Sequence, residues 1–227
     1  AAFGYWAGYA GAAMGLKVWA AQQTGDAPGP AGVQPYGGRA DLLADLARDL
    51  KAGLASGAPR PGAIIIGAKG RVGTGAGDLF DAMGLPSTRW DMDETASGGP
   101  FPEILDHDIF VNCVLALPGI PVFVPRSALS AKRRLSVIAD VSCDPSSPYN
   151  PIPVYDHATS FSDPVIRVAD DPVLDVMAID NLPSMLPVES SRDFAAQLLP
   201  SLLQLAPEDT GVWARARALF DRHIANL

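Results

Sequence analysis

The chain has 227 residues, of which 48% are apolar, so it is long enough to bury the core of one α/β domain with additional elements. The 25 acidic residues outnumber the 17 basic ones, and the formal net charge of −8 disfavours nucleic acid and anionic membranes as partners. The two cysteines, Cys113 and Cys143, lie in apolar runs. We therefore expect reduced, buried thiols in a cytoplasmic protein.

The segment 1–24 is predicted to form a helix. One of its faces would carry four glycines: Gly4, Gly8, Gly11 and Gly15. Their spacing places them on the same side of the helix, where another backbone can come close, so a buried packing helix is favoured. The same spacing also serves in membrane helix dimers. The frequent glycines, Lys17 and the lack of a basic leading region argue against a membrane span and against a signal peptide.

The next part of the chain leads into a strand. Residues 25–38 are rich in Pro and Gly and are predicted to form a loop. Leucines at helical spacing from Leu42 to Leu54 predict a second helix that ends near residue 57. The apolar run 63–66 is then predicted to be a strand.

The glycine turn after this strand carries the main functional signal. Gly67, Gly70 and Gly73 follow the pattern G-x-x-G-x-x-G and precede a helical pattern over 75–83. This order predicts a dinucleotide site, because glycine lets a pyrophosphate approach main-chain N–H groups at the positive end of a helix. The spacing alone also fits an ordinary glycine-rich turn.

A carboxylate further along the chain strengthens the dinucleotide interpretation. Residues 88–92 are predicted to form a second strand, and Asp91 in it lies 18 residues after Gly73. An acid about 20 residues beyond the glycines can accept hydrogen bonds from the adenosine ribose hydroxyls and would repel a 2′-phosphate. Asp93 and Glu94 are alternatives, although both are more simply interpreted as solvated loop acids.

Three further apolar runs are predicted to be strands: 108–117, 135–142 and 173–179. Continuous apolar strands indicate a parallel sheet that is covered on both faces. The loop 144–153 would lie at the carboxyl end of a strand, where ligands bind in doubly wound sheets. Residues 132–134 are interpreted as a solvated basic face, and 190–227 as helical.

These patterns predict an α/β fold with a Rossmann-like, doubly wound and mostly parallel sheet and with flanking N- and C-terminal helices. The expected division is 1–60 for linking and packing helices, 61–185 for the dinucleotide-binding domain and 186–227 for C-terminal helices. No metal site and no serine hydrolase are predicted, since H-E-x-x-H, C-x-x-C and G-x-S-x-G motifs are missing from the sequence. The chain thus offers a cofactor site without an obvious general base.

The chain also carries an ordered series of motifs: Ala1-Ala2-Phe3-Gly4-Tyr5-Trp6-Ala7-Gly8, Gly67-Ala68-Lys69-Gly70-Arg71-Val72-Gly73, Trp90-Asp91, Glu94-Thr95-Ala96-Ser97-Gly98-Gly99-Pro100-Phe101, Ile109-Phe110-Val111-Asn112-Cys113, Asp140-Val141-Ser142, Asn150-Pro151-Ile152-Pro153, Asp180-Asn181-Leu182-Pro183-Ser184 and Leu219-Phe220-Asp221-Arg222-His223. In these motifs it resembles the NAD-dependent, lysine-forming saccharopine dehydrogenases. That family is related to alanine dehydrogenase and to the NAD domain of transhydrogenase.

The resemblance implies a cofactor, a reaction and a first set of site residues. The cofactor is NAD, and the reaction is the oxidative deamination of saccharopine to L-lysine and 2-oxoglutarate, or its reverse, in lysine biosynthesis. Gly70 and Arg71 would meet the pyrophosphate of NAD. Asp91 and Thr95 would hold the adenosine side.

Other residues are implied to line the rest of the cofactor cleft: Leu115 and Val141 from the ends of their strands, and Ile179, Asp180, Asn181 and Leu182 near the nicotinamide. Of these, Asp180 would lie closest to the chemistry and assist it. In the family, the Lys/His pair credited with proton transfer and much of the substrate pocket precede the segment at which this chain starts.

We therefore expect this chain to be the cofactor-binding part of an enzyme and inactive alone. An N-terminal domain would be its intramolecular partner, and the C-terminal helices would pack toward that domain. The first residue is Ala1 rather than Met, so either a segment has been removed or the chain is a piece of a longer protein. Val72 stands where some relatives have Cys, and Asn181 where the family has His. Asn181 leaves open an alanine dehydrogenase-like enzyme, and the missing general base leaves open a non-catalytic NAD-binding module.

Overall fold

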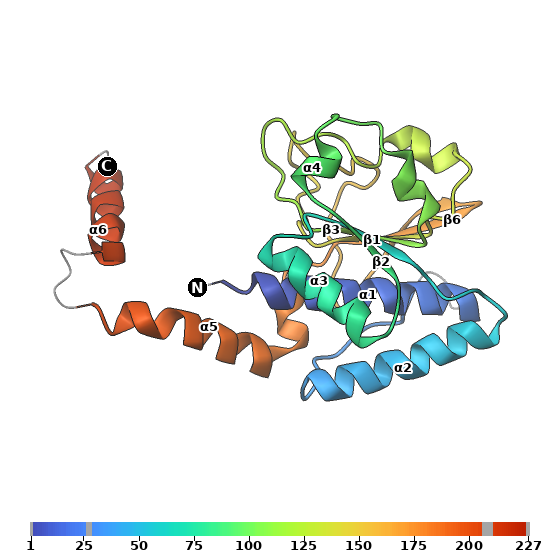
Figure 1. Ribbon diagram of the computed structural model, residues 1–227, viewed down its shortest axis with the longest axis horizontal. Helices are drawn as coiled ribbons and strands as arrows, with labels where there is room; N and C mark the ends of the chain where they lie inside the picture. The colour runs from blue at the N-terminus through green and yellow to red at the C-terminus, as the bar shows by residue number, and fades with distance from the viewer. Residues whose placement is uncertain (1, 26–28, 206–210, 226–227) are drawn as a thin grey trace.

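A mostly parallel sheet forms the centre of the computed structural model, which describes residues 2–25, 29–205 and 211–225 (Figure 1). Its strand order is β2-β1-β3-β4-β6-β5. The strands are β1 (Ala63–Ile66), β2 (Ser87–Trp90), β3 (Ile109–Asn112), β4 (Val137–Asp140), β5 (Ile166–Asp170) and β6 (Val173–Met177). All neighbouring strands pair in parallel except β5 and β6, which are antiparallel at one edge. The predicted α/β class and the doubly wound, mostly parallel sheet are confirmed.

Helices and 3-10 turns cover both faces of this sheet. On one side lie α1 (Gly4–Thr24), α2 (Arg39–Ala55) and α3 (Arg71–Ala82), and on the other α4 (Met92–Thr95), η1 (Pro102–Asp106) and η2 (Arg126–Ser130) (Figure 1). Strand β1 shows why its sequence is apolar throughout. Ala63 and Ile65 belong to the core under α1, whereas Ile64 and Ile66 belong to the core on the opposite face. Successive side chains alternate between the faces, so burial on both requires a continuous apolar run.

Helix α1 confirms the predicted glycine face. A Cβ atom on Gly8 would lie 1.8 Å from the carbonyl oxygen of Val72, and a Cβ on Gly75 would lie 1.9 Å from that of Tyr5. The backbones of α1 and α3 are therefore in direct contact. Since residues of α1 and of the strands share one core, α1 packs against the sheet as well as against α3.

Three details differ from the sequence-based expectation. The run 108–117 leaves the sheet after Asn112, and Leu115 beyond it is 61% exposed. Strand β5 was not predicted, because it is a short edge strand in which Arg167 and Asp170 interrupt the apolar residues. Arg133 is not a solvated side chain, since its guanidinium donates to the carbonyl oxygens of Leu135 and Val173 at 2.6 and 2.8 Å.

The C-terminal helices extend away from the sheet (Figure 1). After η3 (Leu182–Met185), α5 (Pro187–Leu202) runs beside the start of α1, where Phe194 stacks on Phe3 with ring centroids 4.6 Å apart. Helix α6 (Gly211–Ile224) has no buried residue in its described part. No helix among the described residues is long and apolar enough to cross a membrane. The division into 1–60, 61–185 and 186–227 stays a prediction.

Candidate functional site

The order in which successive strands are added to the sheet reverses between β1 and β3. The chain passes from β1 through α3 to β2 on one side of β1, and then crosses to β3 on its other side. In doubly wound sheets, ligands bind at such a switch point, beyond the carboxyl ends of the strands. Here those ends are Gly67, which follows β1, and Cys113, which follows β3.

Gly67 and Gly73 are required by the backbone at this point. Gly67 has φ 87°, and a Cβ on it would lie 2.8 Å from the carbonyl oxygen of Cys113. A Cβ on Gly73 would lie 2.2 Å from the carbonyl oxygen of Gly67, because α3 begins directly against the turn. Both positions therefore accept only glycine without a backbone shift.

Gly70 has a different role, because it is the N-cap of α3 and its surroundings are open. No side chain among the residues that the structure describes caps this helix. A Cβ on Gly70 would meet only the carbonyl oxygen of Gly67, at 3.3 Å. The first N–H groups of α3 therefore have no side-chain acceptor, and the positive end of the helix dipole is free to attract an anion.

Asp91 follows β2 and joins two loops. Its Oδ2 accepts a hydrogen bond from the backbone N–H of Lys69 at 2.7 Å, and its Oδ1 accepts from that of Met92 at 3.0 Å. Glu94 completes a capping box by accepting from the Asp91 N–H at 2.7 Å, and the Thr95 hydroxyl donates to the Asp91 carbonyl at 2.9 Å. Asp91 thus links the glycine turn to the start of α4, and Glu94 has a structural partner that the sequence analysis did not predict.

The other predicted site residues divide into exposed and buried ones. Leu115, Asp180 and Asn181 are exposed in loops that follow β3 and β6. Ile179 and Leu182 are 0% and 1% exposed, so their side chains belong to the core and only their neighbours face solvent.

Val141 and Leu182 meet at α1. A Cβ on Gly11 would lie 2.5 Å from the Val141 Cγ2 and 3.3 Å from the Leu182 Cδ1. The loops after β4 and β6 therefore converge on the same glycine of the packing helix. This contact brings together two of the predicted site residues through core packing.

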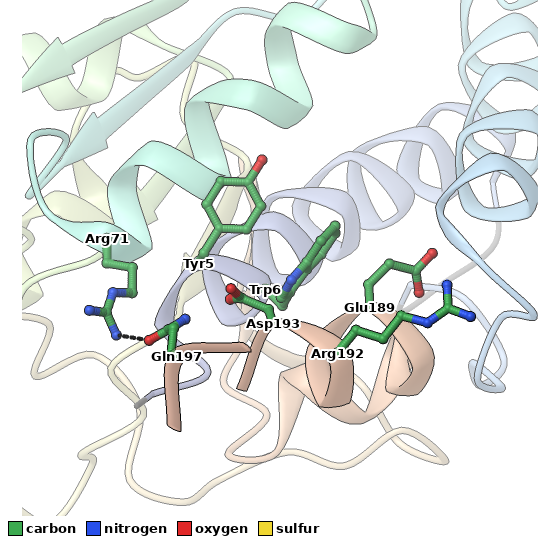
Figure 2. Close-up of a pocket in the computed structure, with 7 residues that line it drawn as sticks. All are labelled: Tyr5, Trp6, Arg71, Glu189, Arg192, Asp193 and Gln197. Carbon is green, nitrogen blue, oxygen red and sulfur yellow. Dashed lines mark hydrogen bonds between the residues drawn. The ribbon is translucent and has the colours of Figure 1, made fainter. Parts of the chain in front are cut away.

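Two pockets flank the start of α1. Asp180 and Asn181 line one of about 540 Å³, together with Phe3 and Gly4. The other, of about 670 Å³, lies between the starts of α1 and α3 and the helix α5 (Figure 2). Arg71 reaches across that second pocket and donates to the Gln197 side chain at 3.1 Å. The guanidinium of Arg71 is therefore held toward α5.

A buried polar network at the ends of β3 and β4 was missed by the sequence analysis. Asp140 is 1% exposed and accepts hydrogen bonds from the Asn112 side chain at 2.9 Å and from the Tyr155 hydroxyl at 2.6 Å. Burial raises the pKa of Asp140 although its hydrogen bonds oppose this, and burial also raises the pKa of Tyr155. The available signal was a polar residue at the end of each of two apolar strands. Among the described residues, no group of three or more His, Cys, Asp or Glu side chains could hold a metal ion.

A doubly wound sheet, a glycine turn at its switch point and a carboxylate at the end of the neighbouring strand define the Rossmann-like class of α/β proteins. No protein-family model matches the chain. Similarity to individual proteins is extensive, however. This chain is 48% identical over 235 residues to the saccharopine dehydrogenase [NAD(+), L-lysine-forming] of Yarrowia lipolytica, and 46% identical over 245 residues to that of Candida albicans. The protein of the same name from Schizosaccharomyces pombe is 42% identical over 236 residues.

Each of these three alignments covers 100% of this chain and 64% of the relative. The chain is therefore a homologue, along its whole length, of NAD(+)-dependent, L-lysine-forming saccharopine dehydrogenases, and it spans about 64% of the length of these curated relatives. The resemblance inferred from the motifs is confirmed.

Proposed function

We propose that this chain is the NAD-binding part of an L-lysine-forming saccharopine dehydrogenase. The whole protein would convert saccharopine and NAD to L-lysine, 2-oxoglutarate and NADH, or run the reverse reaction. The observation that carries the proposal is the similarity of the entire chain to enzymes with that name. A cytoplasmic location is part of the proposal and is supported by the two unpaired cysteines.

The glycine turn fits the pyrophosphate of NAD. Its backbone is free of side chains where α3 begins, and the N–H groups there lack a side-chain cap. Arg71 is the first residue of this helix and is exposed, so it can turn from Gln197 toward the phosphates. When bound, NAD supplies the hydride acceptor, and the chain's own task is to bind and orient it.

Asp91 would select NAD over NADP. Its carboxylate lies at the end of β2, beside the glycine turn, and has lone pairs left after accepting from Lys69 and Met92. Hydrogen bonds from the two ribose hydroxyls would use them, and the negative charge would repel a 2′-phosphate. Thr95 is held one helical turn later, where it donates to the Asp91 carbonyl.

The remaining chemistry needs groups from outside this chain. Asp180 and Asn181 line the pocket beside α1 and would assist at the nicotinamide end. The main proton-transfer groups would belong to the further domain that the relatives' greater length implies. Helix α6 supports such a partner, since Leu219, Phe220 and Ile224 are 48%, 60% and 47% exposed.

Cofactor binding is tested by titrating the chain with NADH and NADPH and following the fluorescence of the reduced nicotinamide. We expect NADH to bind more tightly. Asp91→Ala should weaken NADH binding by about 1–3 kcal/mol, because hydrogen bonds to a charged group are lost, and should reduce the discrimination against NADPH. Equal or tighter binding of NADPH by the unaltered chain would contradict the role of Asp91.

Two variants control for structural effects at this site. Asp91→Asn preserves a good helix N-cap while removing the charge, so α4 should survive and the discrimination against NADPH should still fall. Asp93→Ala removes a carboxylate that is 81% exposed and forms a salt bridge with the exposed Lys69, so it should leave both affinities unchanged.

The reaction is tested on the full-length gene product, by following NADH oxidation with lysine plus 2-oxoglutarate and, separately, with pyruvate plus ammonia. Turnover with the first pair alone supports the proposal. Turnover with the second pair would indicate an alanine dehydrogenase-like enzyme, and no turnover with either would indicate a non-catalytic NAD-binding module.

A further inference from the structure

The Asp140 carboxylate organises the backbone that follows β4. Its Oδ1 accepts hydrogen bonds from the N–H groups of Ser142 and Cys143 at 3.1 and 3.3 Å. These bonds close a tight turn in which Cys143 has φ 52°, a left-handed conformation that residues other than glycine seldom adopt. The carboxylate therefore fixes the direction in which the chain leaves the sheet, immediately after Val141.

The same carboxylate reaches the loop that follows β3. Its Oδ1 also accepts from the Asn112 side-chain N–H₂ at 2.9 Å, and the Asn112 Oδ1 accepts from the backbone N–H of Val114 at 3.2 Å. Asn112 and Asp140 are direct partners in the β3–β4 register. One carboxylate thus holds the loops that carry Leu115 and Val141, two residues predicted to line the cofactor cleft.

A third connection closes the long loop after β4. The Tyr155 hydroxyl donates to the Asp140 Oδ2 at 2.6 Å, and Ile152, Val154 and Tyr155 are all buried. In the same turn, the Ser142 hydroxyl oxygen is buried and has no hydrogen-bond partner among the described residues. A buried polar atom without a partner is rare, which is consistent with a ligand group or a water at this edge of the sheet.

We propose that Asp140 is a positioning residue for the nicotinamide half of the dinucleotide, acting through the two loops that it holds. The inference rests on the proposed NAD binding. In Rossmann-like folds the two halves of a dinucleotide lie on the two sides of the switch point. The glycine turn and Asp91 occupy the β1–β2 side, and the Asp140 network occupies the β3–β4 side. Loss of Asp140 should therefore affect one half of the ligand more than the other.

Asp175 provides a matched control in the same sheet. It is 0% exposed. Its carboxylate accepts hydrogen bonds from the Arg167 guanidinium at 2.5 Å and from the Gln22 side-chain amide at 2.7 Å. In the β4–β6 register it is level with Val137, the first residue of β4, whereas Asp140 is the last. A substitution at Asp175 thus disturbs an equally buried carboxylate on the neighbouring strand, at the opposite end of the parallel strands from Asp140.

The test compares NADH with ADP-ribose, which lacks the nicotinamide, by calorimetric titration of the 227-residue chain. Asp140→Ala should raise the Kd of NADH about tenfold and change that of ADP-ribose by less than about twofold. Asp140→Asn, which retains one acceptor oxygen, should recover part of the NADH affinity. Tyr155→Phe should act in the same direction as Asp140→Ala with a smaller effect. Asp175→Asn should lower thermal stability and leave the ratio of the two dissociation constants unchanged.

Several results would overturn the inference. The first is that the Asp140 and Tyr155 variants weaken the binding of NADH and of ADP-ribose equally, and the second is that they weaken the binding of neither. The third is that Asp175→Asn shows the same selective loss of NADH affinity. If Asp140→Ala does not fold, Asp140→Asn and Tyr155→Phe decide the question on the same criterion. An unaltered chain that binds neither NADH nor ADP-ribose would overturn the proposed function, and this inference with it. If the unaltered chain binds both ligands and the variants show no selective loss of NADH affinity, only the inference about Asp140 fails and the proposed function stands.

Discussion

Replacing Gly8 with alanine should force α1 and α3 apart. The added Cβ would lie 1.8 Å from the carbonyl oxygen and 2.7 Å from the carbonyl carbon of Val72, and 3.1 Å from the backbone nitrogen of Ala76. These are main-chain atoms inside a helix, so no side-chain rotation can make room. The two helices must therefore separate by roughly 1 Å, since protein interiors have almost no free volume.

The cost follows from what lies between these helices. Tyr9 of α1 and Leu79 and Phe80 of α3 are all fully buried, in the single core that these helices share with one face of the sheet. A gap of about 1 Å forfeits up to half of each van der Waals contact across it. Overpacking costs about 1–3 kcal/mol or more, whereas replacing glycine by alanine in a helix returns roughly 1 kcal/mol. We expect Gly8→Ala to lower the free energy of unfolding by about 2 kcal/mol.

The measurement is urea denaturation followed by tryptophan fluorescence and circular dichroism. Gly4→Ala is the control on the same helical face, because its Cβ would meet only side-chain atoms, the nearest being the Val72 Cγ2 at 3.3 Å. That variant should stay within about 0.5 kcal/mol of the unaltered chain. A Gly8→Ala variant equally close to the unaltered chain would refute the direct backbone contact between α1 and α3.

Two further predictions concern buried ionisable groups. Burial lowers the pKa of Lys17, but its hydrogen bonds to Asp45 and Asp49 outweigh burial and raise the pKa above 10.5. Burial likewise raises the pKa of Asp45, but its hydrogen bond with Lys17 helps to hold that pKa below 3.8. Their mutual stabilisation is present between these limits and is lost as the pH falls through the lowered pKa of Asp45. Lys17→Met should therefore cost about 2 kcal/mol of stability at neutral pH and progressively less as the pH falls below the lowered pKa of Asp45. Urea denaturation at a series of pH values from about 7 to about 2 would show this, and a pH-independent loss would contradict the ion pair. Burial and nearby carboxylates raise the pKa of Cys143 to about 11, and burial raises that of Cys113. Both cysteines are only partly buried, not fully buried as the sequence suggested. Because the thiolate is the reactive form, both thiols should react more slowly with a disulfide reagent at pH 8 in the native chain than in the unfolded chain, and equal rates would contradict the raised pKa values.

Local patterns predicted most of the helices and strands and the position of the glycine turn, whereas the roles of the site residues stay predictions. The glycine face of α1 could be inferred because glycine spacing reports directly on helix geometry, and Gly8 does contact α3. The turn at Gly67 could be inferred because a strand, a glycine and a helix are adjacent in sequence. The parallel sheet followed from apolar strands that must be buried on both faces.

What could not be predicted depends on contacts between distant segments. An irregular loop brings Tyr155 back to Asp140, so no periodic pattern in the sequence predicts their hydrogen bond. Strand β5 was not predicted because two of its five residues are charged and it has no continuous apolar run. Arg133 looks like a surface cation in sequence, but the carbonyl oxygens that it binds include that of Val173, 40 residues away.

The position of α1 in the chain has a consequence for how the protein is made. Helix α1 precedes every strand, yet its partners include α3, β3, β4 and η3, and η3 begins only at Leu182. At the usual pace of synthesis the ribosome needs on the order of ten seconds to reach that point. Throughout that interval an almost wholly apolar helix has no complete surface to pack against. The growing chain should therefore depend on chaperones, and folding should be slow because its central contacts are long-range.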